Sequence, residues 1–181
     1  MGGLLGLLAV LCLVLVIWWR IRSARRISRP VQIENAHLDV QHLADGDLQG
    51  AQVADRIEDP RLAAAGIIVA IATMDGPISQ AEITRLRRGA EETFDVNERE
   101  ALELVSLGRW LAREFGTNAE AVRHLSRIVL RTAGLEVGPD LVRMAEEVAM
   151  AGDAELGPEQ REVLAKLRHV FGIESAGRQQ G

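Results

Sequence analysis

Two short acidic turns contain the side chains of this chain that are best suited to chemistry. The first runs from Asp75 to Glu82 and the second from Asp153 to Gln160. Each turn follows an alanine-rich apolar stretch and precedes another segment with a helical pattern. Carboxylates delivered from two turns can surround a hard cation, whereas a single turn of this kind usually only caps a helix. The repeat therefore suggests two half-sites that converge in the fold.

The candidate metal ligands are oxygen donors from both turns. They are Asp75 and Glu82 in the first turn, and Asp153, Glu155 and Gln160 in the second. Sites made only of oxygen select Ca²⁺, Mg²⁺ or Mn²⁺ over zinc or copper. We therefore expect Ca²⁺ or another divalent cation as the cofactor, and no organic cofactor. The spacing is not that of an EF-hand loop, which alternates its acids and ends on a glutamate.

The same residues also have a purely structural interpretation. Ser79 followed by Glu82 has the spacing of a capping box, and an acid in the first turn of a helix gains about 0.3–1 kcal/mol from the helix dipole. The Asp-Gly and Gly-Pro pairs of the first turn are common turn formers. Spacing alone therefore leaves cation binding and helix capping both open.

The elements that position these turns are predicted to be helices. Helical patterns continue from residue 59 to residue 173, and no segment alternates with period two. The stretch from Leu62 to Met74 is apolar almost all round, which predicts a buried central helix. Helix starts are indicated by Asp59-Pro60, by the capping pairs Ser79/Glu82, Asn97/Glu100 and Thr117/Glu120, and by Pro139 and Pro158. We therefore predict an all-α domain, a compact bundle of about six helices.

Two further side-chain patterns lie on the predicted helices. On the last predicted helix, five apolar side chains are expected to face inward: Val163, Leu164, Leu167, Val170 and Phe171. Arginines recur every four residues at Arg123, Arg127 and Arg131. This stripe is interpreted as a solvated face, with contact to an anionic partner or lipid headgroup as the alternative.

Residues 1–20 have the composition of a membrane anchor. The run is uncharged and apolar to Trp19, close to the roughly 17–25 residues that a spanning helix needs. Trp18 and Trp19 stand where an interfacial belt is expected. Five arginines follow at once: Arg20, Arg22, Arg25, Arg26 and Arg29. A cleavable signal peptide, the alternative, carries its positive charge before the apolar run. We expect a single-pass anchor, with residues 1–29 contacting membrane lipid and the downstream domain in the cytoplasm.

The rest of the sequence indicates how the chain is divided and which classes of function are not expected. Residues 21–58 are expected to form a basic juxtamembrane segment and polar tether, and residues 174–181 a flexible tail. All 26 acidic residues, but only 16 of the 21 basic ones, follow Pro30, so a nucleic-acid partner is not expected. No set of residues has the pattern of a nucleophile with its base, and no glycine-rich phosphate loop occurs. The sequence does not predict an enzyme.

The helix before Met74, the turn from Asp75 to Glu82 and the later segment 151–159 resemble the TerB-like domain. That domain occurs in tellurite-resistance proteins and in the N-terminal part of membrane-anchored DnaJ-like co-chaperones. The resemblance covers about residues 60–172. It implies a helical bundle with a divalent-cation site between the two acidic loops. It also implies a scaffold role at the bacterial inner membrane, in envelope or stress-response complexes with protein partners.

The sequence departs from the family pattern at two positions in the second turn. Ala154 stands where glycine is usual, and Gln160 stands where glutamate is usual. Glutamine still offers a carbonyl oxygen but removes one negative charge, which implies a weaker second half-site. The chain also contains no His-Pro-Asp motif, so a J domain is not expected. The alternative function is a metal-independent protein-interaction adaptor related to co-chaperone N-terminal domains.

Overall fold

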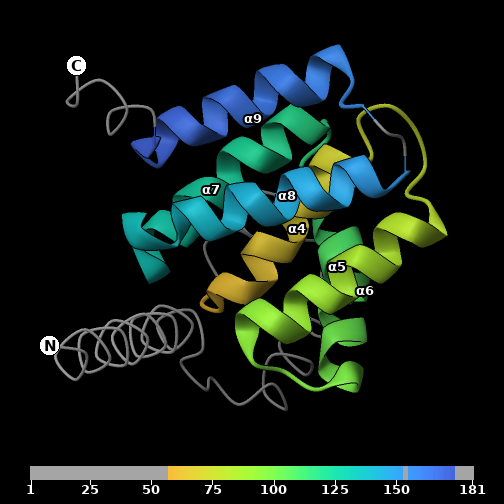
Figure 1. Ribbon diagram of the computed structural model, residues 1–181. Helices are drawn as coiled ribbons and strands as arrows, with labels where there is room; N and C mark the ends of the chain where they lie inside the picture. Colours follow the sequence, from red (N-terminus) through yellow and green to blue (C-terminus); the bar gives the residue numbers. More distant parts are fainter. Residues whose placement is uncertain (1–56, 153–154, 174–181) are drawn as a thin grey trace, which may run out of the picture.

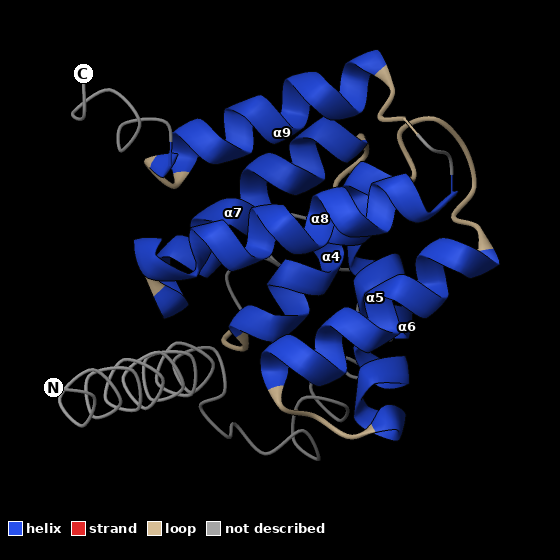
Figure 2. Cartoon of the chain, viewed as in Figure 1, coloured by secondary structure: helices blue, strands red, loops and turns tan. Residues whose placement is uncertain are grey.

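The computed structural model describes residues 57–152 and 155–173, and within these residues every regular element is helical (Figures 1 and 2). The elements are α4 (Pro60–Ala72), α5 (Gln80–Phe94), α6 (Glu98–Arg113), α7 (Asn118–Ala133), the 3₁₀ turn η1 (Leu135–Val137), α8 (Gly138–Gly152) and α9 (Pro158–Val170). This confirms the predicted all-α bundle for the described part of the chain. The expected anchor at residues 1–20, the tether up to residue 56 and the tail at residues 174–181 lie outside the described residues.

Helix α4 is the centre of the bundle, as its apolar composition predicts (Figure 1). Every residue of it from Arg61 to Ala72 is buried. It packs chiefly against α6 and α7, and then against α8. Its one charged residue, Arg61, is neutralised at the helix start, where its guanidinium lies 2.7 Å from the carboxylate of Asp59. The same carboxylate caps α4 by accepting from the Arg61 amide at 2.9 Å.

Small residues set the close crossing of α4 and α6. A Cβ on Gly108 of α6 would lie 2.9 Å from the carbonyl carbon of Ala65 and 3.0 Å from its Cβ. Carbon atoms in van der Waals contact lie about 3.5–4.0 Å apart, so no larger residue fits without a shift of one helix. The crossing therefore depends on glycine in α6 facing alanine in α4.

The predicted start signals are confirmed at α5 and α6. Ser79 and Glu82 form a reciprocal capping box, as do Asn97 and Glu100. At α7 the pairing differs in one respect. The Thr117 hydroxyl accepts from the Glu120 amide at 3.2 Å, as expected, but it also donates to the Glu120 carboxylate at 3.0 Å.

The C-terminal part of the bundle contains one correction. Val170 was predicted to face inward on α9, and this prediction is wrong, since Val170 is 43% exposed. The apolar stripe continues instead from Leu167 to Phe171, four residues on, which puts both side chains on one helical face. The Phe171 ring packs against Gly138, where a Cβ would lie 2.5 Å from the Phe171 Cβ.

Buried apolar side chains from all six α-helices form a single core, from Ile57 to Phe171. The predicted arginine stripe of α7 is exposed at all three positions. No helix among the described residues is both long and apolar enough to cross a membrane.

Candidate functional site

The two acidic loops lie against each other in the fold. The first loop, residues 73–79, connects α4 to α5, and the second loop, residues 153–157, connects α8 to α9. The Asp75 carboxylate lies 3.9 Å from the point where a Cβ on Gly157 would stand. Both carboxylate oxygens of Glu82 lie 3.2 Å from the corresponding point on Gly152. We call this contact region, formed by Asp75, Glu82, Gly152, Gly157 and Gln160, the loop junction.

Gln160 ties the loop junction to the core. Its side chain is 1% exposed. The amide nitrogen Nε2 donates to the carbonyl oxygen of Ile71 at 3.2 Å, in the last turn of α4. The amide oxygen Oε1 accepts from the backbone N–H of Gly157 at 2.9 Å, at the start of α9. One side chain thus joins the helix before the first loop to the helix after the second.

Glu82 contributes a buried carboxylate to the junction. Its exposed fraction is 6%. The oxygen Oε2 accepts from the Ser79 amide at 2.7 Å, and the Glu82 amide donates to the Ser79 hydroxyl at 3.2 Å. The capping box therefore fixes the rotamer of Glu82, and the fold places that carboxylate beside the end of α8. The predicted helix-capping role of Glu82 is confirmed. The structure also places its carboxylate beside the second loop.

The other predicted ligands are less enclosed. Asp75 and Glu155 are exposed. Asp153 lies outside the described residues, as does Ala154. Across the described ranges, no group of three or more histidine, cysteine, aspartate or glutamate side chains is arranged to hold a metal ion. The fold therefore brings Asp75 and Gln160 together beside Gly157, places Glu82 beside Gly152 and leaves Glu155 exposed on the second loop.

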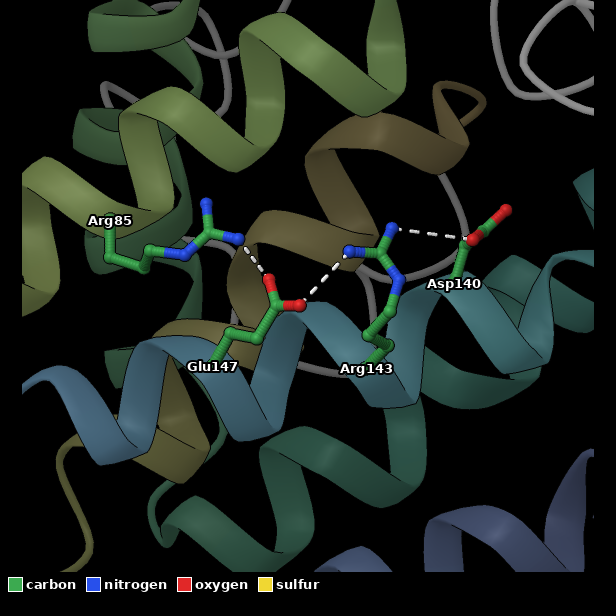
Figure 3. A network of polar contacts seen from close by, with 4 residues as sticks. All are labelled: Arg85, Asp140, Arg143 and Glu147. Atoms are coloured by element: carbon green, nitrogen blue, oxygen red, sulfur yellow. Dashed lines mark hydrogen bonds and ion pairs between the residues drawn. The ribbon is translucent and has the colours of Figure 1, made fainter. Parts of the chain in front are cut away.

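A polar network that the sequence motifs did not single out aligns α5 with α8 (Figure 3). Glu147 of α8 accepts from Arg85 of α5 through one carboxylate oxygen and from Arg143 through the other, at 3.1 Å. Arg143 also donates to Asp140 at 3.3 Å. Partial burial lowers the pKa of Arg143, but the hydrogen bonds and charges of Glu147 and Asp140 outweigh it and raise the pKa overall.

The spacing of Asp140, Arg143 and Glu147 along α8 is visible in the sequence as neighbouring positions on one helical face. Their link to α5 through Arg85 is not, because it depends on how the helices pack. The network holds together α5, which has Glu82 in its first turn, and α8, which ends at Gly152. It thereby supports the loop junction from one side.

Comparison with known proteins identifies one match. The family model described as tellurite resistance protein TerB matches residues 61–180. The matched range includes both acidic loops and nearly all of the helical core. No curated protein and no solved structure matches the chain.

Proposed function

The chain belongs to the tellurite resistance protein TerB family, and on that basis we propose that its helical domain binds one divalent cation at the loop junction. The proposed ligands are Asp75 from the first loop, Glu82 from the first turn of α5, and Asp153 and Glu155 from the second loop, with the Gln160 carbonyl as a further donor. The cation is Ca²⁺ or another hard divalent ion, because all these donors are oxygens.

The contact between the two loops carries this proposal. Asp75 lies beside Gly157, and Glu82 lies beside Gly152. Carboxylates of the first loop therefore stand within reach of the second loop, so both loops can supply ligands to one ion. Calcium accepts about six to eight oxygens, and backbone carbonyls and water complete such a set. The buried Glu82 carboxylate is fixed by its cap, which lowers the entropic cost of holding an ion.

The proposed cellular role is that of a membrane-anchored, non-catalytic scaffold. The uncharged run at residues 1–20 and the arginines that follow it favour a single-pass anchor in the bacterial inner membrane with the helical domain in the cytoplasm. The domain then displays the loop junction to cytoplasmic or membrane protein partners. Cation binding would rigidify the two loops together and thereby set the surface that such a partner contacts.

Thermal unfolding of the full-length chain in a neutral detergent tests the cation site. A ligand that binds only the folded state at 100 times its Kd stabilises by about 2.7 kcal/mol, and each kcal/mol raises the Tm of a chain of this size by about 2–4 °C. We expect millimolar Ca²⁺, Mg²⁺ or Mn²⁺ to raise the Tm by several degrees relative to chelator.

Three variants assign the effect to the junction. Asp75→Asn and Asp153→Asn should reduce the cation-dependent rise in Tm. Glu82→Gln should also reduce it while keeping the helix start intact, because glutamine can still accept from the Ser79 amide. Glu92→Gln, an equal charge change at an exposed position of α5, is the matched control and should respond like the parent. An unchanged Tm of the parent in all three cations contradicts cation binding.

The second candidate function is a metal-independent protein-interaction adaptor. The structural hydrogen bonds of Glu82 and Gln160 favour it. Glu82 and Gln160 both have structural hydrogen-bond partners, so neither needs a metal to account for its burial. An adaptor should capture the same crosslinked partners in chelator and in Ca²⁺, from membranes containing the anchored chain. Failure to recover a reproducible partner in either condition counts against it.

A further inference from the structure

A polar pocket lies beside the first loop. It has a volume of about 370 Å³ and is bounded by Gly76, Pro77 and Ile78 of that loop, by the C-terminal half of α6 and by the start of α7. The volume falls within the roughly 300–1,000 Å³ of small-molecule sites. The first loop therefore contacts the second loop through Asp75 and lines this pocket through its Gly76-Pro77-Ile78 segment.

Two arginines provide the charge of the pocket. Arg109 and Arg113 both line it, and they stand four residues apart on one face of α6. Neither makes an ion pair or a side-chain hydrogen bond within the described part of the chain, whereas Arg85 and Arg143 are fully engaged with carboxylates. No carboxylate is among the residues that line the pocket. Two guanidinium groups thus line one hollow whose lining residues include no carboxylate.

The opposite wall of the pocket is compatible with negative charge. Gly116 and Asn118 line it at the start of α7, where helix N–H groups present a partial positive charge. The nearest acid of that turn is Glu120, whose carboxylate accepts from the Thr117 hydroxyl at 3.0 Å as part of the cap. Its other neighbour is Gly116, where a Cβ would lie 3.3 Å from the Glu120 Oε2 atom, so this carboxylate stands at the edge of the pocket without lining it.

A structural role accounts for only part of this arrangement. Arg113 is in the last turn of α6, where a cation gains about 0.3–1 kcal/mol from the helix dipole. Arg109 lies a full turn earlier, beyond the range of that effect. Neither placement explains why both side chains border the same cavity.

We propose that this pocket binds an oxyanion of the phosphate type through Arg109 and Arg113. Guanidinium groups match the oxygens of phosphate bidentately, and two of them can balance a dianion. Inorganic phosphate and the phosphomonoester headgroup of a lipid share this chemistry.

Isothermal titration of the full-length chain in a neutral detergent with inorganic phosphate tests the proposal, against chloride at equal ionic strength. We expect saturable one-to-one binding of phosphate. The double variant Arg109→Gln, Arg113→Gln should bind at least about tenfold more weakly. Arg123→Gln removes an exposed arginine of α7 that does not line the pocket, so it should bind phosphate like the parent.

A second variant separates binding from folding. Asn118→Asp places a carboxylate in the pocket wall at the first position of α7, where an acid favours the helix. It should weaken phosphate binding while the Tm stays equal or rises. Absence of saturable phosphate binding, or parent-like binding by the Arg109/Arg113 double variant or by Asn118→Asp, overturns the proposal.

Soluble dibutyryl phosphatidic acid distinguishes the source of the oxyanion. Binding about tenfold tighter than that of inorganic phosphate, lost again in the Asn118→Asp variant, assigns the pocket to a lipid headgroup. Equal or weaker binding assigns it to free phosphate.

Discussion

At the scale of single residues, the loop junction depends on side chains that cap helices and join loops at the same time. Glu82 completes a capping box and also lies beside the end of α8. Its cap is predictable from the sequence because Ser79 and Glu82 are three residues apart. Its proximity to Gly152 is not predictable in this way, because that contact depends on the packing of α5 against α8.

Gln160 is a second residue whose contacts depend on packing and cannot be predicted from the sequence pattern. At the sequence level, the resemblance to the TerB-like domain implies that Gln160 is a weaker cation ligand than glutamate, because glutamine carries no charge. In the structure both of its polar ends have partners, and its amide nitrogen donates to the carbonyl oxygen of Ile71. A carboxylate cannot make that donation when ionised. The departure from glutamate therefore has a structural consequence that the sequence pattern does not reveal.

The first prediction concerns this residue. Gln160→Glu should lower the free energy of unfolding by about 1–3 kcal/mol in chelator at neutral pH, because it places a buried carboxylate against the Ile71 carbonyl and removes a hydrogen bond. Urea unfolding monitored by circular dichroism measures the change. Gln80→Glu makes the same substitution at an exposed position in the first turn of α5 and should stay within about 0.5 kcal/mol of the parent. Equal effects of the two substitutions would contradict the role of Gln160 as a link to α4.

At the scale of elements, local signals fix where helices begin, and tertiary contacts fix how they cross. The starts of α4, α5, α6 and α9 follow from caps and prolines that the sequence displays. The 3₁₀ turn η1 and the exposure of Val170 were not anticipated, since both depend on how the chain leaves α7 and how α9 rests on the core. The pairing of α4 with α6 likewise depends on long-range packing.

The second prediction concerns that pairing. Gly108→Ala should destabilise the fold by about 1–3 kcal/mol, because the new Cβ would lie 2.9 Å from the Ala65 carbonyl carbon. Helix propensity alone favours the opposite sign, since alanine is better than glycine inside a helix by about 1 kcal/mol. Ser106→Ala, an exposed position of the same helix, is the control and should be neutral or slightly stabilising. Denaturant titration compares the two, and a gain of stability in Gly108→Ala would show that α6 can move away without cost.

At the scale of the whole molecule, residues of one loop border two regions of opposite charge. The carboxylates of Asp75 and Glu82 lie beside Gly157 and Gly152, and Arg109 and Arg113 line a pocket with Gly76, Pro77 and Ile78 of the same loop. The first loop also follows directly from α4, whose residues are buried almost throughout. A buried central helix thus leads into a short loop that contributes to both a proposed cation site and a proposed oxyanion pocket. The two sites can be tested separately because their ligands are of opposite sign.

The third prediction concerns the independence of the helical domain from the N-terminal part of the chain. Among the described residues the core runs from Ile57 to Phe171, and Ile57 is 3% exposed. A fragment of residues 57–181 should therefore unfold cooperatively, with a Tm within a few degrees of that of the full chain in the same detergent. In cells the fragment should leave the membrane fraction, whereas the full chain should remain in it. Calorimetry and cell fractionation measure the two effects separately. A fragment that unfolds without cooperativity would show that residues before Ile57 complete the core, and a fragment that stays in the membrane fraction would show that residues 1–20 are not the only anchor.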